Sequence, residues 1–219
     1  MSRIAVAADD SPTSDFWDAT VPVVQDRNLE HDLLIPAFGE VRRWDLRALG
    51  WNPAAGRGSV ALLFHAFRDG WNLRARELAI ALLNPAHQVL RDHGIYRSAA
   101  PPHVKTIRSR LDGLKYFAAW HDNHFAGVPL RQLTQADLDR FLVEARATAA
   151  PSTLRQAIEG VRDLHAHRAV LTGGGISFRP WGESSTIAVS GQGDVPWIGG
   201  GFGRVVFVVD VGEPSCDGQ

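Results

Sequence analysis

Apolar residues recur at every third or fourth position in several stretches of this 219-residue chain, and that spacing predicts amphipathic helices. The first stretch ends at Asn84, and its apolar face consists of Leu73, Leu78, Leu82 and the alanines between them. We expect Asn72 to cap this helix, and Asn84 to end it because the residue before a proline disfavours helical backbone. The preceding residues 59–67 fit a strand or a helix.

Two further helices are predicted on either side of a loop at residues 123–129. The first has a buried face made of Val104, Ile107, Leu111, Leu114 and Ala118. The second is expected to begin at Thr134, with Asp137 in its first turn as a capping-box partner. Its apolar positions are Leu138, Phe141, Leu142 and Ala145.

A last helix is expected to start at Ser152, whose hydroxyl suits an N-cap. Its core face consists of Leu154, Ile158, Val161 and either Leu164 or His165. The run Thr172–Gly175 is expected to end it, because glycine readily adopts the left-handed conformation at a helix C-terminus. Because the connections are short, the pattern predicts a mainly α fold, a small orthogonal helical bundle.

Both ends of the chain differ from this helical part. Residues 1–57 scatter Trp17, Trp44 and Trp51 among Pro, Asp and Gly, so we expect an irregular N-terminal extension that packs its tryptophans on something larger. A short helix is expected around Glu40–Leu49, and residues 17–30 suit extended backbone. In residues 191–219 eight of 29 residues are glycine and the run VVFVVDV has no obvious partner strand, so we expect a Gly-rich, disordered tail.

Composition narrows the class of protein. A 45% hydrophobic and 21% charged chain is typical of a globular protein. The single cysteine, Cys216, excludes an internal disulfide framework and cannot build a structural zinc site alone. The N-terminus turns acidic too early for a secretory signal, and no stretch approaches the roughly 20 apolar residues that cross a bilayer. We therefore expect a cytoplasmic protein.

Charge is unevenly distributed although the net charge is only −1. Residues 1–60 hold nine acids and six bases, whereas residues 97–168 hold eleven bases and seven acids. Helical spacing places Lys105, Arg108 and Lys115 on one face, and Arg155 and Arg162 on one face of the last helix. Cations held on one side of a rigid element can bind phosphates, and a merely solvated polar face is the alternative interpretation.

Motifs for catalysis, cofactors and metals are weak. His165 and Arg168 match a His-x-x-Arg pattern, but both tyrosines, Tyr96 and Tyr116, lie upstream of it. The pair His121 and His124 has no further metal ligands at suitable spacing. The glycine run at residues 199–203 lacks the Lys-Ser/Thr of a phosphate loop. We therefore predict no catalytic residue, cofactor, metal site or small-molecule substrate.

The order of three segments resembles the core-binding domain of actinobacterial phage-integrase-type tyrosine recombinases. These segments are Leu130–Leu142 (LRQLTQADLDRFL), Arg162–Arg168 (RDLHAHR) and Phe178–Gly182 (FRPWG). The resemblance implies an N-terminal extension at 1–85, a helical core-binding domain at 86–183 that grips DNA, and a tail at 184–219. In that family a catalytic domain follows. The resemblance implies that the Gly-rich tail stands in its place here, and we expect it to be a linker remnant or an out-of-frame segment.

The resemblance implies double-stranded DNA as the partner, in DNA integration and site-specific recombination of a mobile element, without strand cleavage by this chain. Lys105, Arg108, Lys115, Arg155 and Arg162 become the candidate DNA contacts. An intact recombinase is a further candidate partner, and no membrane partner is expected. Three alternatives stay open: a helical protein-interaction module, a non-functional remnant of an integrase gene, and a nuclease or transferase that uses Tyr116.

Overall fold

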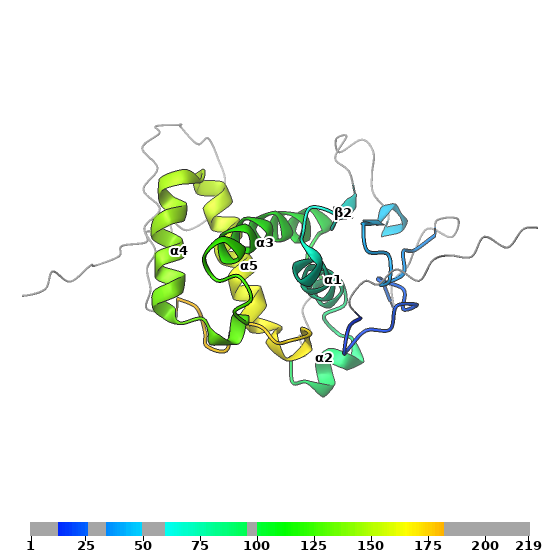
Figure 1. Ribbon diagram of the computed structural model, residues 1–219. Helices are drawn as coiled ribbons and strands as arrows, with labels where there is room; N and C mark the ends of the chain where they lie inside the picture. The colour runs from blue at the N-terminus through cyan, green and yellow to red at the C-terminus, as the bar shows by residue number, and fades with distance from the viewer. Residues whose placement is uncertain (1–12, 26–33, 50–59, 96–99, 182–219) are drawn as a thin grey trace, which may run out of the picture.

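The computed structural model describes residues 13–25, 34–49, 60–95 and 100–181, and the described chain is mainly helical, as the sequence predicts (Figure 1). The α-helices are α1 (Asp69–Leu83), α2 (Gln88–Asp92), α3 (Val104–His124), α4 (Gln135–Thr148) and α5 (Pro151–Ala166). The short elements are strands β1 (Arg43–Asp45) and β2 (Ala61–Leu63) and the 3-10 turns η1 (Arg47–Leu49), η3 (Leu130–Gln132) and η4 (Arg168–Val170).

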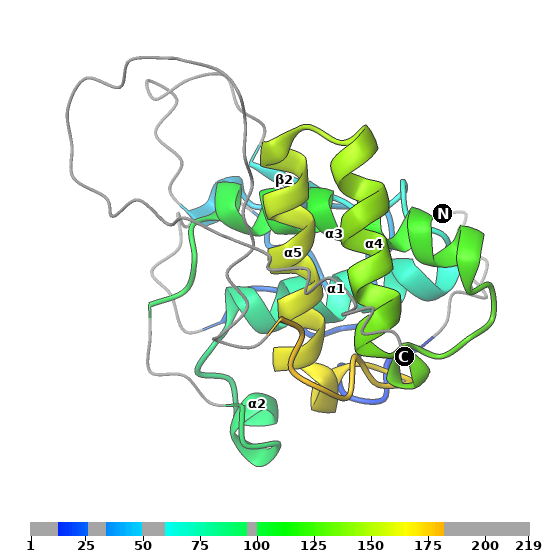
Figure 2. The same cartoon turned by 90° about the vertical axis from the view of Figure 1, so that its left-hand side faces the viewer.

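Helix α3 is the centre of the arrangement. In Figure 2, α4 and α5 lie side by side and α3 crosses behind them, while α1 lies beyond α3. Helix α3 contacts both α5 and α1. One hydrophobic cluster runs from Trp17 through Trp44 and Trp71 to Trp181. The core therefore continues across position 85, which is the expected boundary between the N-terminal extension and the helical bundle.

The helices α3 and α5 approach backbone to backbone at two glycines. A Cβ on Gly113 would collide with the backbone of Gln156 and Ala157. A Cβ on Gly160 would lie 3.1 Å from the carbonyl oxygen of Arg110. Because neither residue carries a side chain, the helix axes come close and bury the apolar faces of both helices.

One ion pair bridges the same two helices. Nη1 of Arg110 lies 3.1 Å from Oδ2 of Asp163. Asp163 is a buried acid, and its Arg110 partner provides the charged hydrogen bonds that a buried carboxylate needs. The contact between α3 and α5 thus combines close backbone packing with one partly buried charge pair.

The predicted cap of α4 is confirmed. The Thr134 side chain accepts from the backbone N–H of Asp137, and the Asp137 carboxylate accepts from the backbone N–H of Thr134. All of the predicted apolar positions of α4 are buried: Leu138, Phe141, Leu142 and Ala145. On α3, Ile107, Leu111, Leu114 and Ala118 are buried and Val104 is half-buried.

The predicted Ser152 cap is wrong. The N-cap of α5 is Ala150, two residues earlier, and the helix begins at Pro151, because proline at the first helical position needs no backbone N–H partner and has the right φ. Ser152 is therefore an exposed first-turn residue. The open choice in the core face is decided for Leu164, which is fully buried, while His165 is half-buried.

The end of α5 differs in detail from the prediction. The helix ends at Ala166 and continues as η4, and the left-handed glycines Gly173 and Gly174 follow, with φ of 75° and 78°. These glycines turn the chain after η4 rather than at the helix end itself. A tighter turn at the end of an α-helix is a common way to satisfy its last carbonyls.

The predicted Asn72 cap is also wrong. Helix α1 starts at Asp69 with Arg68 as N-cap, and Asn72 lies in the first turn. The Asn72 amide donates to the carbonyl oxygens of Val41 and Phe64, at 2.9 and 3.0 Å. The amide therefore satisfies backbone of the neighbouring β1–β2 region rather than the helix end. The predicted end at Asn84 is confirmed.

The short helix expected around Glu40–Leu49 is not found. This segment holds β1, which pairs antiparallel with β2 through Trp44 and Leu62, and then the η1 turn. Both Trp44 and Leu62 are fully buried. Pairing with a distant strand overrides the local preference, which the sequence alone does not reveal. Residues 59–67, left open between strand and helix, supply β2.

Polar side chains of α1 hold the irregular N-terminal segments. The Arg76 guanidinium donates to the Phe38 carbonyl at 2.9 Å, and the Asn84 amide donates to the Val23 carbonyl at 2.9 Å. Trp17 and Trp44 are buried against this framework, which confirms that the extension packs its tryptophans. Trp51, the tail at 184–219 and its valine run lie outside the described residues. Among the helices that the structure describes, none is long and apolar enough to span a bilayer.

Candidate nucleic-acid interface

The three candidate DNA contacts of α3 share one side of that helix. Lys105 is exposed, and Arg108 and Lys115 are half-buried. Lys115 Nζ lies 3.4 Å from Oδ1 of the exposed Asp112. Residues two positions apart on a helix differ by about 200° in direction, so Arg108 and Lys115 point away from α5, toward which Arg110 and Gly113 face.

The same argument applies to α5. Arg155 is exposed, and Nη1 of the half-buried Arg162 lies 3.0 Å from Oε1 of Glu159. Each of these arginines is two residues from a position in contact with α3, namely Ala157 and Gly160. They therefore point away from α3. The structure does not bring the five candidate contacts onto one face.

The cations on the two faces differ in number. The α3 set has three cations, with the acids Asp112 and Asp122 along the same side, an excess of one positive charge. The α5 set has two arginines and Glu159, an excess of one. Exposed ion pairs of this kind contribute only about 0–1 kcal/mol, so either can be exchanged for contact with a phosphate. The α3 face has the larger number of cations, three against two, and is the stronger candidate for that reason.

A pocket of about 500 Å³, which the sequence alone does not predict, lies at the C-terminal end of the α3 face. Its charged and aromatic lining comes from the N-cap and first turns of α1, the end of α3 and η3: Arg68, Trp71, Arg74, His121, Asp122 and Arg131. We call it the Arg74 pocket. Asp122 follows Lys115 by seven residues and Arg108 by fourteen, so all three lie along one side of α3.

Asp122 is engaged by neighbours inside the Arg74 pocket. Its Oδ1 accepts from the indole N–H of Trp71 at 3.0 Å, and its Oδ2 lies 3.4 Å from Nη1 of Arg68. His121 packs edge-on against Trp71, and burial lowers the pKa of its imidazole, so the neutral form is favoured near neutral pH. Nδ1 of His121 lies 3.8 Å from Oδ1 of Asp122, beyond hydrogen-bond distance, and neither ring nitrogen has a hydrogen-bond partner among the described residues.

Arg74 is held over Trp71, with its guanidinium carbon 5.7 Å from the ring centroid. Nη1 donates to the carbonyl of Gly70 at 3.3 Å, while its buried Nε has no partner within the described chain. A Cβ on Gly173 would lie 3.1 Å from Nη2 of Arg74. Burial lowers the pKa of Arg74, with Glu77 and Asp122 opposing that effect.

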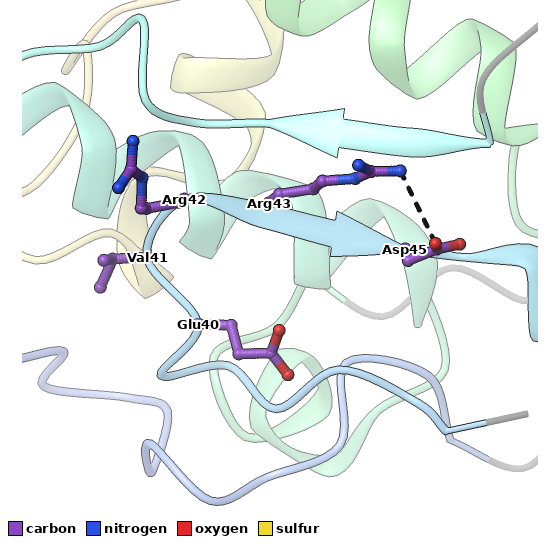
Figure 3. A pocket seen from close by; sticks show the side chains of 5 residues that line it. All are labelled: Glu40, Val41, Arg42, Arg43 and Asp45. Carbon is purple, nitrogen blue, oxygen red and sulfur yellow. Dashed lines mark ion pairs between the residues drawn. The ribbon is translucent and has the colours of Figure 1, made fainter. Parts of the chain in front are cut away.

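A second hollow, of about 520 Å³, lies along β1 and the residues just before it (Figure 3). Arg42 and Arg43 line it together with Glu40 and Asp45, so its positive and negative charges balance. Nη2 of Arg43 lies 3.6 Å from Oδ2 of Asp45, the pair joined by the dashed line in Figure 3. This open hollow offers no excess charge of either sign to a ligand.

The remaining motifs have structural partners. His165 Nδ1 lies 3.0 Å from the Ile176 carbonyl oxygen, and Arg168 donates to the carbonyl of His165 at 3.0 Å. Both side chains thereby bind backbone near the end of α5. The Tyr116 hydroxyl lies 2.7 Å from Oγ1 of Thr148, which joins α3 to α4. Each group thus stabilises local structure.

The two histidines near the end of α3 point to different surroundings. His124 Nε2 lies 3.3 Å from Oε2 of Glu144 on α4, whereas His121 faces Trp71 on α1. No group of three or more metal-ligating side chains occurs in the part of the chain that the structure describes.

The sequence contained part of the signal for the Arg74 pocket. The heptad spacing of Arg108, Lys115 and Asp122 is visible in the sequence, but Arg74 and Arg131 are 57 residues apart and only the fold brings them together. Comparison with protein-family models, with curated proteins and with solved structures gave no match to this chain.

Proposed function

We propose that this chain binds double-stranded DNA through the α3 face, defined by Lys105, Arg108 and Lys115. One observation supports this most: the three cations lie on the side of a 21-residue helix that is turned away from its α5 partner. Lys105 and Lys115 are ten residues apart, about 15 Å along the axis, so the helix holds the three cations in a rigid row on that side. Such a row releases condensed counterions on contact with a phosphate backbone.

The opposite orientation of the α5 cations sharpens this proposal. A straight duplex that lies against the α3 face cannot also lie against Arg155 and Arg162, which point away from α3. We therefore assign direct contact to the α3 set. The further proposal that DNA binding serves site-specific recombination and integration, without cleavage by this chain, rests on the resemblance of the three segments alone.

The test is fluorescence anisotropy of a labelled DNA duplex with the purified chain, repeated across a salt series. We expect affinity to fall steeply with salt. The double variant Lys105→Ala/Lys115→Ala should reduce the slope of log K against log salt by about 0.9 for each phosphate that the variant no longer binds. The matched control, Arg155→Ala/Arg162→Ala, removes two cations from the other side and should leave the slope nearly unchanged.

Three results would contradict the proposal. Absence of binding at low salt by folded protein leaves the protein-interaction module or the gene remnant as the better interpretation. A slope reduced only by the α5 variant moves the contact to the other face. Cleavage that disappears with Tyr116→Phe would show that the chain is a nuclease or transferase.

A further inference from the structure

Positive charge accumulates in the Arg74 pocket beyond what its own acid can balance. Arg68, Arg74 and Arg131 supply three cations, and Asp122 is the one acid among its lining residues. That acid is already engaged by Trp71 and Arg68. His121 adds no charge when neutral. The lining residues therefore carry an excess of two positive charges, which the Glu77 carboxyl behind Arg74 reduces when it is ionised, and the concavity concentrates the field that attracts anions.

The two remaining arginines are placed to serve a ligand. Arg131 has an exposed side chain with no ion pair among the described residues. Arg74 is fixed by Trp71 and Gly70, with its second terminal nitrogen beside Gly173, which has no side chain to cover it. A guanidinium offers a planar fork of donors that matches phosphate oxygens in pairs. Fixing it beforehand lowers the entropy lost on binding.

We propose that the Arg74 pocket binds a phosphate group, with Arg74 and Arg131 as its direct partners. The phosphate has two sources with the same chemistry. One is free phosphate or a small phosphate ester, and the other is a backbone phosphate of a duplex lying along the α3 face, which ends at this pocket. The pocket site does not depend on the proposed DNA binding, because its lining alone defines it.

The first measurement is calorimetric titration of the chain with inorganic phosphate, with chloride holding ionic strength constant. We expect saturable binding that weakens about tenfold in Arg131→Gln, because a charge-assisted hydrogen bond is removed. Arg131→Gln removes an exposed side chain and should leave the fold unchanged. Arg74→Gln should weaken binding at least as much. Arg146→Gln, an exposed arginine on α4 outside the pocket, is the matched control and should have no effect.

The second measurement distinguishes the two sources. Arg131→Gln is compared with Arg146→Gln in the anisotropy titration against duplex DNA. A salt slope reduced by about 0.9 in Arg131→Gln alone assigns the site to a DNA phosphate. Phosphate binding by calorimetry with an unchanged DNA slope assigns it to a small phosphate ligand. If phosphate does not bind and the DNA slope is unchanged, the pocket proposal is wrong, whether or not the α3 variants affect DNA binding.

Discussion

Two contacts in the molecule are built differently: the contact between α3 and α5, and the contact between α1 and the N-terminal segments. Toward α5, Gly113 and Gly160 let two backbones approach closely, so the two helices pack with little space between them. Toward the N-terminal segments, α1 uses polar side chains as connectors. Asn72, Arg76 and Asn84 donate to backbone carbonyls of residues far away in the sequence.

The difference follows from what each region lacks. Two helices satisfy their own backbone groups, so their contact rests mainly on close packing of apolar surface, joined here by the Arg110–Asp163 ion pair. The segments at residues 13–25 and 34–49 have few regular backbone pairs, so their buried carbonyls need donors from elsewhere. Helix α1 supplies these donors. Stability should therefore depend on side-chain volume at the contact between α3 and α5, and on hydrogen-bond donors at the contact between α1 and the N-terminal segments.

The largest effect is expected from Gly113→Ala. The added methyl group meets the backbone of α5, which cannot move without separating the helices, so we expect a loss of about 3 kcal/mol or more in the free energy of unfolding. Chemical denaturation measures it. Gly70→Ala is the matched control in α1, where the nearest atom would be 3.6 Å away, at the end of the Arg74 side chain. It should be neutral or stabilise by up to about 1 kcal/mol. Equal effects would contradict the close-packing account.

An intermediate effect is expected from Glu77→Gln, which tests the polar side of the comparison. The fully buried Glu77 accepts from the Ser14 hydroxyl and from both the N–H and the hydroxyl of Thr172. A glutamine cannot accept at both oxygen positions, so we expect a loss of about 1–3 kcal/mol. Glu159→Gln breaks the exposed pair with Arg162 and should cost less than about 1 kcal/mol. A similar loss of stability in both variants would show that the buried hydrogen bonds of Glu77 stabilise the fold no more than the exposed Glu159–Arg162 pair does.

The Glu77 effect should depend on pH. Burial raises the pKa of the Glu77 carboxyl in the folded chain, against the hydrogen bonds that lower it. The stability linked to its protonation is therefore fully present below the unfolded pKa and is lost as pH rises through the folded pKa. Denaturation of wild type and Glu77→Gln at pH 4.5 and pH 8 measures this. The difference in the free energy of unfolding between wild type and Glu77→Gln should be larger at pH 4.5. A larger difference at pH 8 would contradict a raised pKa of Glu77 in the folded chain.

The smallest effect is expected at a helix cap, away from both contacts. Thr134→Ala removes the capping box of α4 and should cost about 1 kcal/mol. Ser152→Ala is the control, because Ser152 follows Pro151 inside the first turn of α5 and caps nothing. It should change stability by less than about 0.5 kcal/mol. Thermal unfolding of both variants compares them, and an equal loss would restore Ser152 as a cap.

The sequence by itself determined the long helices α1, α3, α4 and α5 and their buried faces, but not the short α2. Local chemistry was sufficient where it is strong, as in the Thr134 and Asp137 capping box, and apolar spacing identified Leu111, Phe141 and Leu154 as core residues. It also placed Lys105, Arg108 and Lys115 on one side of α3, because helical periodicity depends only on neighbours along the chain. Whether DNA binds there stays a prediction.

Only the tertiary structure decided how these faces combine. It turned Asn72 from a supposed cap into a donor for Val41 and Phe64, and it made β1 where a helix was expected, because both depend on partners distant in sequence. It also set the α3 and α5 cations on opposite sides and gathered Arg74 and Arg131 in one pocket. Periodicity fixes the direction of a side chain relative to its own helix, whereas packing fixes the helix relative to everything else.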